Sequence, residues 1–422
     1  MSRQGKTFVI GVGMTKFERP MSKQWDYPDM GREAGSTALA DAGISYNSVQ
    51  TVVASYCYGE PTCGQRAVYE LGLTGIPVYN VNNNCSSGSS ALLLARQLVL
   101  SGMDCTMALG FEKMERGLSQ KYEDKISPVK RHMDHMVSLG ADPGLIRPDL
   151  NAMTSDVVKL FAYAAQEYMK KYPALTFNDL ARVALKNRVH GSQNERASLQ
   201  RPTNLQNIKS RMLCYPIALG MSAPTGDGGA AAIVCSEKFV KEHNLQDKAV
   251  EILAQNMVTD LPSSFGKSYM DLSGFAMAQR AADMCYRDSG LTAKDIDVLE
   301  VHDCFSCNEL FMYEALRLVP EGKALELFNT GKWVPTTEGG QVYKMGDRWV
   351  VNASGGLESK GHPIGATGLG QCAELVWQLR GEAGKRQVAG AKTALQHNYG
   401  IGGAAVVTMY QKHKPGIPNA RL

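Results

Sequence analysis

Three short motifs occur in the same order in both halves of this 422-residue chain. A repeated unit restricts the possible folds strongly, because each copy must form a similar structure and the two copies must pack together. The matched pairs are Asp41-Ala42-Gly43-Ile44 with Asp288-Ser289-Gly290-Leu291, Cys85-Ser86-Ser87-Gly88-Ser89-Ser90 with His362-Pro363-Ile364-Gly365-Ala366-Thr367, and Gly228-Gly229-Ala230-Ala231 with Gly402-Gly403-Ala404-Ala405.

The residues around these motifs predict a mixed α/β unit. The first motif is typical of a helix end and a glycine turn, and β-branched residues of a strand follow it in both copies. The second motif leads into a helix of small and apolar residues in each copy, the later one over 367–380. Cys85 and His362 therefore stand at equivalent helix starts, which pseudo-twofold packing brings together. A ligand site is expected where the two halves meet.

Residues 119–221 have no counterpart in the second half and are predicted to form helices and loops laid over one half. This insert, called the loop domain below, divides the chain into an N-terminal half (1–118 and 222–270), the loop domain (119–221) and a C-terminal half (271–422). The loop domain has 15 Lys or Arg against 9 Asp or Glu, a surplus that suits a small anionic ligand. It lacks the dense basic runs with interleaved aromatics of a nucleic-acid surface, so no nucleic-acid partner is expected.

Cys85 follows a polar turn and comes just before the apolar segment Ala91–Leu98. Unpaired N–H groups and the positive end of the dipole favour negative charge at a helix start. The local sequence thus predicts a lowered thiol pKa and a reactive thiolate at Cys85. The alternative is that Cys85 is a small buried residue that only fills a helix start.

The composition describes a globular protein, with 44% hydrophobic and 20% charged residues and no apolar run long enough to span a bilayer. The ten cysteines are scattered, mostly inside apolar segments, which is typical of a reduced intracellular protein. Ala420-Arg421-Leu422 is a conservative variant of the peroxisomal Ser-Lys-Leu signal. It predicts a peroxisome or a related organelle such as the glycosome, with the mitochondrion or cytosol as the alternative.

Four segments together resemble the thiolase superfamily, over essentially the whole chain. Cys85-Ser86-Ser87 matches its Cys-x-Ser nucleophile motif and Gly361-His362-Pro363 its Gly-His-Pro loop. The Asn-Glu-Ala-Phe and Cys-x-Gly loops of conventional thiolases are replaced by His302-Asp303-Cys304-Phe305 and His397-Asn398-Tyr399-Gly400. These departures resemble the sterol-carrier-protein type, the thiolase portion of sterol carrier protein X.

The resemblance implies the α/β thiolase fold, with two duplicated βαβαβαββ halves in a five-layered αβαβα arrangement plus the loop domain. It implies an acetyl-CoA C-acyltransferase that cleaves 3-oxoacyl-CoA, including 2-methyl-branched chains, to acetyl-CoA or propionyl-CoA and a shortened acyl-CoA in fatty-acid β-oxidation. Coenzyme A is then a substrate whose nucleotide the loop domain holds, and no tightly bound cofactor is expected. The family forms homodimers, and in some members tetramers.

Thiolysis assigns roles to the matched residues. A thiolate attacks the keto carbon, which predicts Cys85 as the nucleophile and His362 as its base. The enolate of acetyl-CoA needs hydrogen-bond donors, expected from His302 and His362. Backbone N–H groups of Cys85 and of Gly400 or a neighbour are expected to bind the oxygen on the attacked carbon.

The ordinary Cys-x-Gly cysteine is absent, so Cys304 is predicted as the second acid/base. The remaining residues expected to line the site are Ser87, Asp303, His397 and Asn398; no metal is expected.

Several alternatives remain open at this point. His397 could replace Cys304 as the acid/base, and His302 could be a core histidine. Cys304-Phe305-Ser306-Cys307 is formally a C-x-x-C motif, which alone is weak support for zinc or redox chemistry. The whole chain could also be a ketosynthase-like condensing enzyme or a non-catalytic acyl-CoA- or lipid-binding relative.

Overall fold

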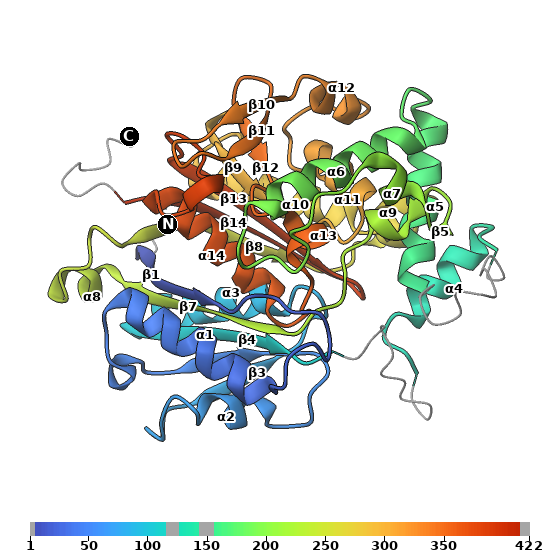
Figure 1. The fold of residues 1–422 in the computed structure, drawn as a ribbon. Coiled ribbons are helices and arrows are strands. Elements are labelled where there is room, and N and C mark those ends of the chain that lie inside the picture. Colours follow the sequence, from blue (N-terminus) through green and yellow to red (C-terminus); the bar gives the residue numbers. More distant parts are fainter. Residues whose placement is uncertain (1–4, 115–125, 143–155, 414–422) are drawn as a thin grey trace.

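A twelve-stranded sheet runs through the molecule (Figure 1). The computed structural model describes residues 5–114, 126–142 and 156–413. Within these ranges the strand order is β10-β11-β12-β9-β13-β14-β8-β1-β7-β4-β2-β3. The Ala420-Arg421-Leu422 signal predicted from the sequence lies outside the described residues.

The sheet consists of two halves with the same strand order. The first half is β3-β2-β4-β7-β1 and the second is β12-β9-β13-β14-β8. If the five strands of each half are numbered in chain order, both halves have the spatial order 3-2-4-5-1. The pairing directions also agree. In the order just given, the first two strand pairs of each half are parallel and the last two are antiparallel. The strands are β1 (Thr7–Met14), β2 (Val52–Ser55), β3 (Val78–Val81), β4 (Cys105–Glu112), β7 (Gly228–Ser236), β8 (Val250–Val258), β9 (Val298–Glu300), β12 (Trp349–Val351), β13 (Thr393–Gly400) and β14 (Ala404–Lys412).

The halves join through β1 and β8, which pair antiparallel at Phe8 with Glu251 and Val9 with Val250. The predicted boundary at residue 271 leaves β8 in the first half, whereas the strand order groups it with β14 of the second. A hairpin of β10 (Lys332–Pro335) and β11 (Gln341–Met345) extends the second half beyond β12.

The two half-sheets separate three layers of helices (Figure 1). Together the sheets and helices form five layers, which is the predicted αβαβα thiolase arrangement. The central layer is α3 (Ser87–Leu100) against α14 (Thr367–Arg380). The outer layers include α1 (Tyr27–Ala42) and α2 (Cys63–Val68) on the first half, and α10 (Phe275–Ser289), α11 (Ser306–Ala315) and α12 (Ala324–Asn329) on the second.

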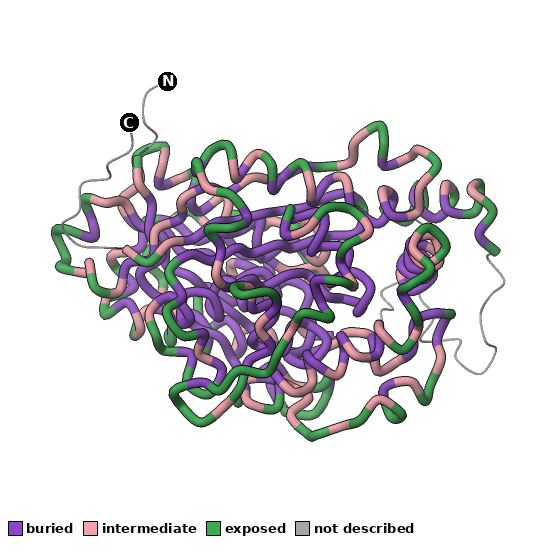
Figure 2. Tube along the Cα trace, turned by 90° about the horizontal axis from the view of Figure 1, so that it is seen from above, coloured by how far each residue is buried: buried purple, intermediate pink, exposed green. Residues whose placement is uncertain are grey.

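The alternation of side chains along β1 explains the layering. Phe8 and Ile10 belong to the core under α1, while Val9 faces the central core with Leu92 of α3. An irregularity in the pairing between Val9 and Gly11 shifts the alternation, so Val12 belongs to the central core as well. Both faces of the strand are therefore buried, as Figure 2 shows for most of the interior of the molecule. The glycine turns predicted after the outer helices are present, with Gly43 and Gly290 in the left-handed conformation at φ 73° and 70°.

The described part of the loop domain packs on the outer face of the C-terminal half. Its helices share one core with α10 and α11, in which the ring of Tyr168 in the loop domain meets that of Phe311 on α11 at a centroid distance of 5.4 Å. Its elements are α4 (Lys130–Ser138), α5 (Asp156–Lys171), α6 (Phe177–Ser192), α7 (Leu205–Lys209), β5 (Met212–Cys214) and β6 (Ile217–Ala218).

The shorter helices complete the chain. They are α8 (Glu237–Glu242), α9 (Tyr269–Leu272) and α13 (Gly356–Lys360). None of the described helices combines the length and the apolar content needed to cross a bilayer.

Candidate active site

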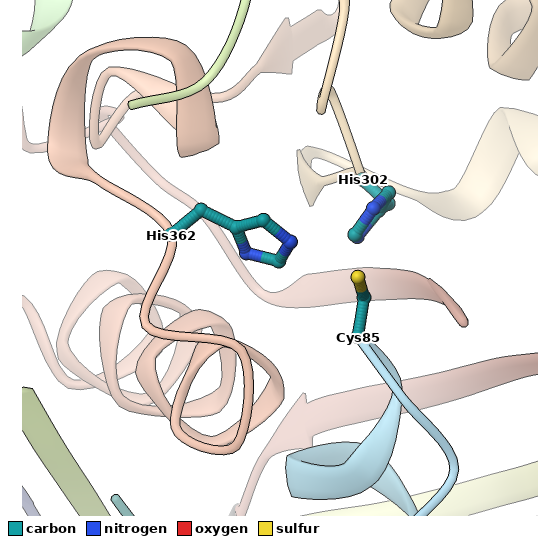
Figure 3. Close-up of side chains that lie close together, drawn as sticks. All are labelled: Cys85, His302 and His362. Carbon is teal, nitrogen blue, oxygen red and sulfur yellow. The ribbon is translucent and has the colours of Figure 1, made fainter. Parts of the chain in front are cut away.

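Cys85, His302 and His362 come together where the loops before α3 and α14 meet the loop after β9 (Figure 3). The Cys85 sulfur and one nitrogen of each ring lie within 4.8 Å of one another. The two imidazoles meet edge to face, with centroids 5.2 Å apart and an interplanar angle of 77°. Cys85 lies just before α3, His362 lies in the loop between α13 and α14, and His302 lies in the loop after β9, so neither half alone contains the cluster.

Glycines allow this close approach. A Cβ on Gly368 would lie 2.3 Å from the backbone nitrogen of Ser89, so α14 touches the first turn of α3 backbone to backbone. A Cβ on Gly400 would lie 2.0 Å from the carbonyl oxygen of Asn83, so the end of β13 presses on the loop before Cys85. Larger residues at either position would separate the two halves at the site.

A tight loop presents Cys85. Asn84 adopts the left-handed conformation at φ 53°, which turns the chain sharply before the thiol. Ser87 fixes this turn, because its hydroxyl donates to Asn84 O at 2.6 Å and accepts from Asn83 N at 2.9 Å. Ser87 thus holds the loop instead of offering its hydroxyl to a ligand. The thiol of Cys57 supports the same turn, 3.3 Å from Asn84 O and 3.4 Å from the Ser87 oxygen.

His362 is oriented as a proton acceptor. Its Nδ1 lies 2.7 Å from the Thr367 hydroxyl, which donates its own proton to Pro363 O at 3.0 Å. The hydroxyl must then accept from Nδ1–H, which assigns the Nδ1 tautomer from the hydrogen-bond network. The lone pair is left on Nε2, which is buried and has no partner among the described residues. This is the atom that a base next to Cys85 needs.

His302 carries the opposite tautomer. Its Nδ1 lies 3.0 Å from the side-chain nitrogen of Asn398, whose oxygen accepts from the Ser89 hydroxyl at 2.9 Å. An amide nitrogen only donates, so Nδ1 accepts and the proton of neutral His302 sits on Nε2. His302 therefore offers a donor where His362 offers an acceptor.

Burial keeps both imidazoles and the thiol neutral. Loss of water lowers the pKa of His362 to about 4, and burial followed by the charges of His362 and His397 lowers the pKa of His302 well below its usual range. Desolvation raises the pKa of Cys85 to about 12. The sequence prediction of a lowered pKa is therefore wrong for the free protein, because removal of water outweighs the helix start.

Two backbone N–H groups, those of Cys85 and Ile401, face the Cys85 sulfur and favour negative charge there. We predicted from the sequence that Gly400 or a neighbour supplies the second donor. In the structure the N–H of the neighbouring Ile401 faces the sulfur. A pair of fixed N–H donors at this point can also bind an oxyanion on a carbon attached to sulfur.

Cys304, Tyr399 and His397 stand around this cluster. The Cys304 thiol is buried, and burial followed by the charge of Cys85 raises its pKa well above the usual value, so the two sulfurs are within electrostatic reach. The Tyr399 ring meets His302 edge-on at 6.2 Å. His397 is fully buried with neither ring nitrogen hydrogen-bonded among the described residues, and burial lowers its pKa to about 3.

Asp303 points away from the cluster of Cys85, His302 and His362. Its carboxylate accepts from Leu357 N at 2.7 Å and from the Asn187 amide at 3.1 Å, at the start of α13. The same amide donates to Glu309 and Glu358, and Lys186 pairs with Glu309, so α6 of the loop domain is tied to the loop that carries His302. Asp303 therefore holds this loop in place.

A thiolate and imidazoles are also zinc ligands. The side-chain amide of Asn398, however, donates a hydrogen bond to Nδ1 of His302. The proton of the neutral ring is therefore on Nε2, the nitrogen that a metal ion would need as its ligand. The arrangement of one acceptor, one donor and one thiol suits proton transfer better than metal binding.

Sequence reasoning did not single out Thr367, Ser89 or Ile401 as partners in the site. Two of these are polar residues in the first turns of otherwise apolar helices, a signal that could have marked them. The role of Ile401 comes from its backbone, which no side-chain pattern reveals.

Comparisons with known proteins identify the family of the chain. The family model described as "Thiolase, N-terminal domain" matches residues 7–211, and "Thiolase C-terminal domain-like" matches residues 266–412. The chain is 51% identical to sterol carrier protein 2 of Bos taurus over 99% of this chain and 74% of that protein. It is 33% identical to acetyl-CoA acetyltransferase of Methanothermobacter thermautotrophicus, covering 96% of this chain and 99% of that one.

The fold also matches a solved structure. Human mitochondrial 3-ketoacyl-CoA thiolase in complex with CoA is similar with a TM-score of 0.69 and 18% identity, over 97% of this chain and 99% of that one. This similarity shows the shared fold.

Proposed function

The chain belongs to the thiolase family, and from this premise we propose that it is a 3-oxoacyl-CoA thiolase acting through an acyl-enzyme at Cys85. The observation that carries the proposal is the pair of opposite histidine tautomers beside one thiol. Substrates are 3-oxoacyl-CoA esters, including those with a 2-methyl branch, and products are acetyl-CoA or propionyl-CoA and a shortened acyl-CoA.

In the first half-reaction the Cys85 sulfur attacks the 3-oxo carbon while Nε2 of His362 takes the thiol proton. The N–H groups of Cys85 and Ile401 bind the resulting oxyanion. The bond between C2 and C3 then breaks, which leaves the acyl group on sulfur and the enolate of acetyl-CoA or propionyl-CoA. His302 Nε2–H and the newly protonated His362 donate to the enolate oxygen.

In the second half-reaction the roles of acid and base change. Cys304 gives its proton to C2 of the enolate, and the first product leaves. The Cys304 thiolate then takes the proton of an incoming CoA thiol, whose sulfur attacks the acyl-enzyme. The bond between the acyl carbon and the Cys85 sulfur breaks, and Cys85 leaves as a thiolate that takes its proton back from His362. A neutral Cys304 thiol before the reaction is what this sequence requires, and burial supports it by raising the thiol pKa.

Three further features complete the proposal. CoA is a substrate, and its nucleotide binds to the loop domain, whose basic surplus supports this. The chain forms a homodimer, supported by the β3 edge, which has no further strand beside it among the described residues. Tyr79 on β3 is exposed, as are Tyr69 and Leu73 in the segment before it. The protein resides in a peroxisome or related organelle, as the C-terminal tripeptide predicts.

The test is a thiolysis assay with acetoacetyl-CoA plus CoA, together with mass spectrometry of the trapped protein. We expect release of acetyl-CoA and an acetyl group on Cys85. The Cys85→Ala variant should lose turnover yet still bind CoA, whereas near-normal thiolysis by this variant would overturn the nucleophile assignment. Decarboxylation of a malonyl thioester without thiolysis would favour a condensing enzyme, and CoA binding without acylation a lipid-binding relative.

A further inference from the structure

A cavity of about 530 Å³ lies outside the group of Cys85, His302 and His362, which is called the acyl cluster from here on. In this cavity the segment after β1 faces the end of α6 and residues 198–203. Its volume falls within the range of ordinary small-molecule sites. The walls come from the N-terminal half and the loop domain, and polar side chains predominate among them.

The cavity is strongly cationic. Its walls include four cationic side chains and a single carboxylate, Glu18, which already pairs with Lys16 at 3.5 Å. The other three cations form no ion pair with a carboxylate among the described residues, although the charge of Glu358 acts on Arg188; they are Arg19, Arg188 and Arg201.

Two of the polar atoms are buried without a partner. Nε of Arg188 and Oγ of Ser198 both lack a hydrogen bond within the described part of the chain. Burial lowers the pKa of Arg188; the charge of Glu358 opposes this effect, and the positive charge of Arg19 adds to it. Two neighbouring guanidinium groups and an unused hydroxyl are unfavourable in an empty protein, and a bound anion would satisfy all three.

We propose that this cavity binds a phosphate-bearing anion. Guanidinium groups donate paired hydrogen bonds that match phosphate oxygens, and a hydroxyl adds a further donor. The ligand has two possible sources: inorganic phosphate or diphosphate, and the phosphorylated nucleotide of CoA. The second source rests on the function proposed above.

The site adjoins the loop of His362. Ser198 N donates to Lys360 O and Leu199 N donates to Ser359 O, both at 3.0 Å, so the cavity wall pairs with the residues just before Gly361-His362-Pro363. The anion would lie beside the catalytic loop without touching the acyl cluster.

The test is calorimetric titration of the full chain with pyrophosphate and, separately, with 3′-phospho-ADP. We expect saturable binding that weakens at least tenfold in Arg19→Gln, Arg201→Gln and Ser198→Ala. The control is Arg287→Gln, which alters an exposed arginine on α10 and should not change binding. Ser198→Ala should also leave the unfolding midpoint unchanged or higher, because the lost hydroxyl had no partner.

Two results would overturn the proposal: no saturable binding of either ligand, or equal binding by the three cavity variants and the control. Competition with acetyl-CoA identifies the source. If acetyl-CoA displaces pyrophosphate, the cavity holds the CoA nucleotide, and if both bind together it holds a free phosphate compound. The titration is independent of turnover, so it keeps its meaning even if the thiolysis assay fails.

Discussion

At the scale of single residues, the site depends on two neutral histidines whose protons sit on different nitrogens. Asn398 sets the tautomer of His302, since its amide donates to Nδ1. The Asn398→Asp variant keeps the shape but replaces the donor with an acceptor, so the His302 proton should move to Nδ1. We expect kcat for thiolysis to fall by about 10²–10³-fold, as for loss of an oxyanion donor. Unchanged kcat would show that His302 donates nothing to the transition state.

Thr367 plays the matching part for His362, because its hydroxyl accepts from Nδ1–H. Thr367→Val removes the acceptor and should lower kcat about tenfold or more, while Thr367→Ser should restore most of it. Equal rates for the valine and serine variants would contradict this positioning role. Denaturant midpoints measured for both variants separate a loss of orientation from a loss of fold.

The raised pKa of Cys85 predicts how the free thiol reacts. With a pKa of about 12, the thiolate fraction grows tenfold for each pH unit between 7 and 9. Iodoacetamide should therefore alkylate Cys85 about a hundredfold faster at pH 9 than at pH 7. The rate is measured by peptide mass spectrometry, with Cys85→Ala as the control. A rate that levels off near pH 7 would restore the lowered pKa expected from the sequence.

The acid limb of turnover tests the protonation state of His362. Its folded pKa of about 4 lies below the usual 6.5, so the ring stays neutral and able to accept a proton at every pH above about 5. We expect kcat/KM to be flat from pH 5 to 7. If kcat/KM instead drops to half of its value at pH 7 when the pH reaches about 6.5, the base has the pKa of an exposed imidazole.

The choice between Cys304 and His397 also belongs at this scale. Cys304 is within electrostatic reach of Cys85, whereas the charge of Cys85 does not perturb His397. Cys304→Ala should slow thiolysis at least a hundredfold and His397→Gln by less than tenfold, measured as kcat with acetoacetyl-CoA. The reverse order would transfer the acid/base role to His397.

At the scale of elements, the contact of α3 with α14 decides the distance between sulfur and imidazole. Gly368→Ala puts a Cβ 2.3 Å from Ser89 N, so the helices must move apart. We expect a loss of about 1–3 kcal/mol in the free energy of unfolding, together with a large loss of kcat. Gly5→Ala, where a Cβ meets nothing within 4 Å, is the matched control and should change neither.

These elements also show how far the sequence could lead. The repeated motifs predicted the equivalence of α3 and α14, and the second helix has the bounds expected, Thr367–Arg380. The pKa of Cys85 was predicted in the wrong direction because the local sequence shows the helix start but not the second half that excludes water. The partner of the His302 Nδ1 atom could not be predicted either, since Asn398 is 96 residues from His302. The cationic cavity joins segments 16–22 and 188–203, which no local pattern connects.

At the scale of the whole molecule, the sheet ends in two edges, β3 and β10. The proposed dimer uses β3, where Tyr79 is 45% exposed. Tyr79→Lys should convert a particle of twice 45.9 kDa into one of 45.9 kDa in light scattering, whereas Trp333→Lys on β10 should not. Dissociation by the second substitution alone would assign the interface to the opposite edge.

The matching strand order of the two halves has a consequence for the two helix starts. Two identical copies of the half-unit, paired about their symmetry axis, would present the same side chain at both helix starts: two thiols or two imidazoles. In a single chain the two equivalent positions can carry different residues, and here one carries the Cys85 thiol and the other the His362 imidazole. His302 adds a second imidazole from the loop after β9, so the thiol of one half faces two imidazoles of the other.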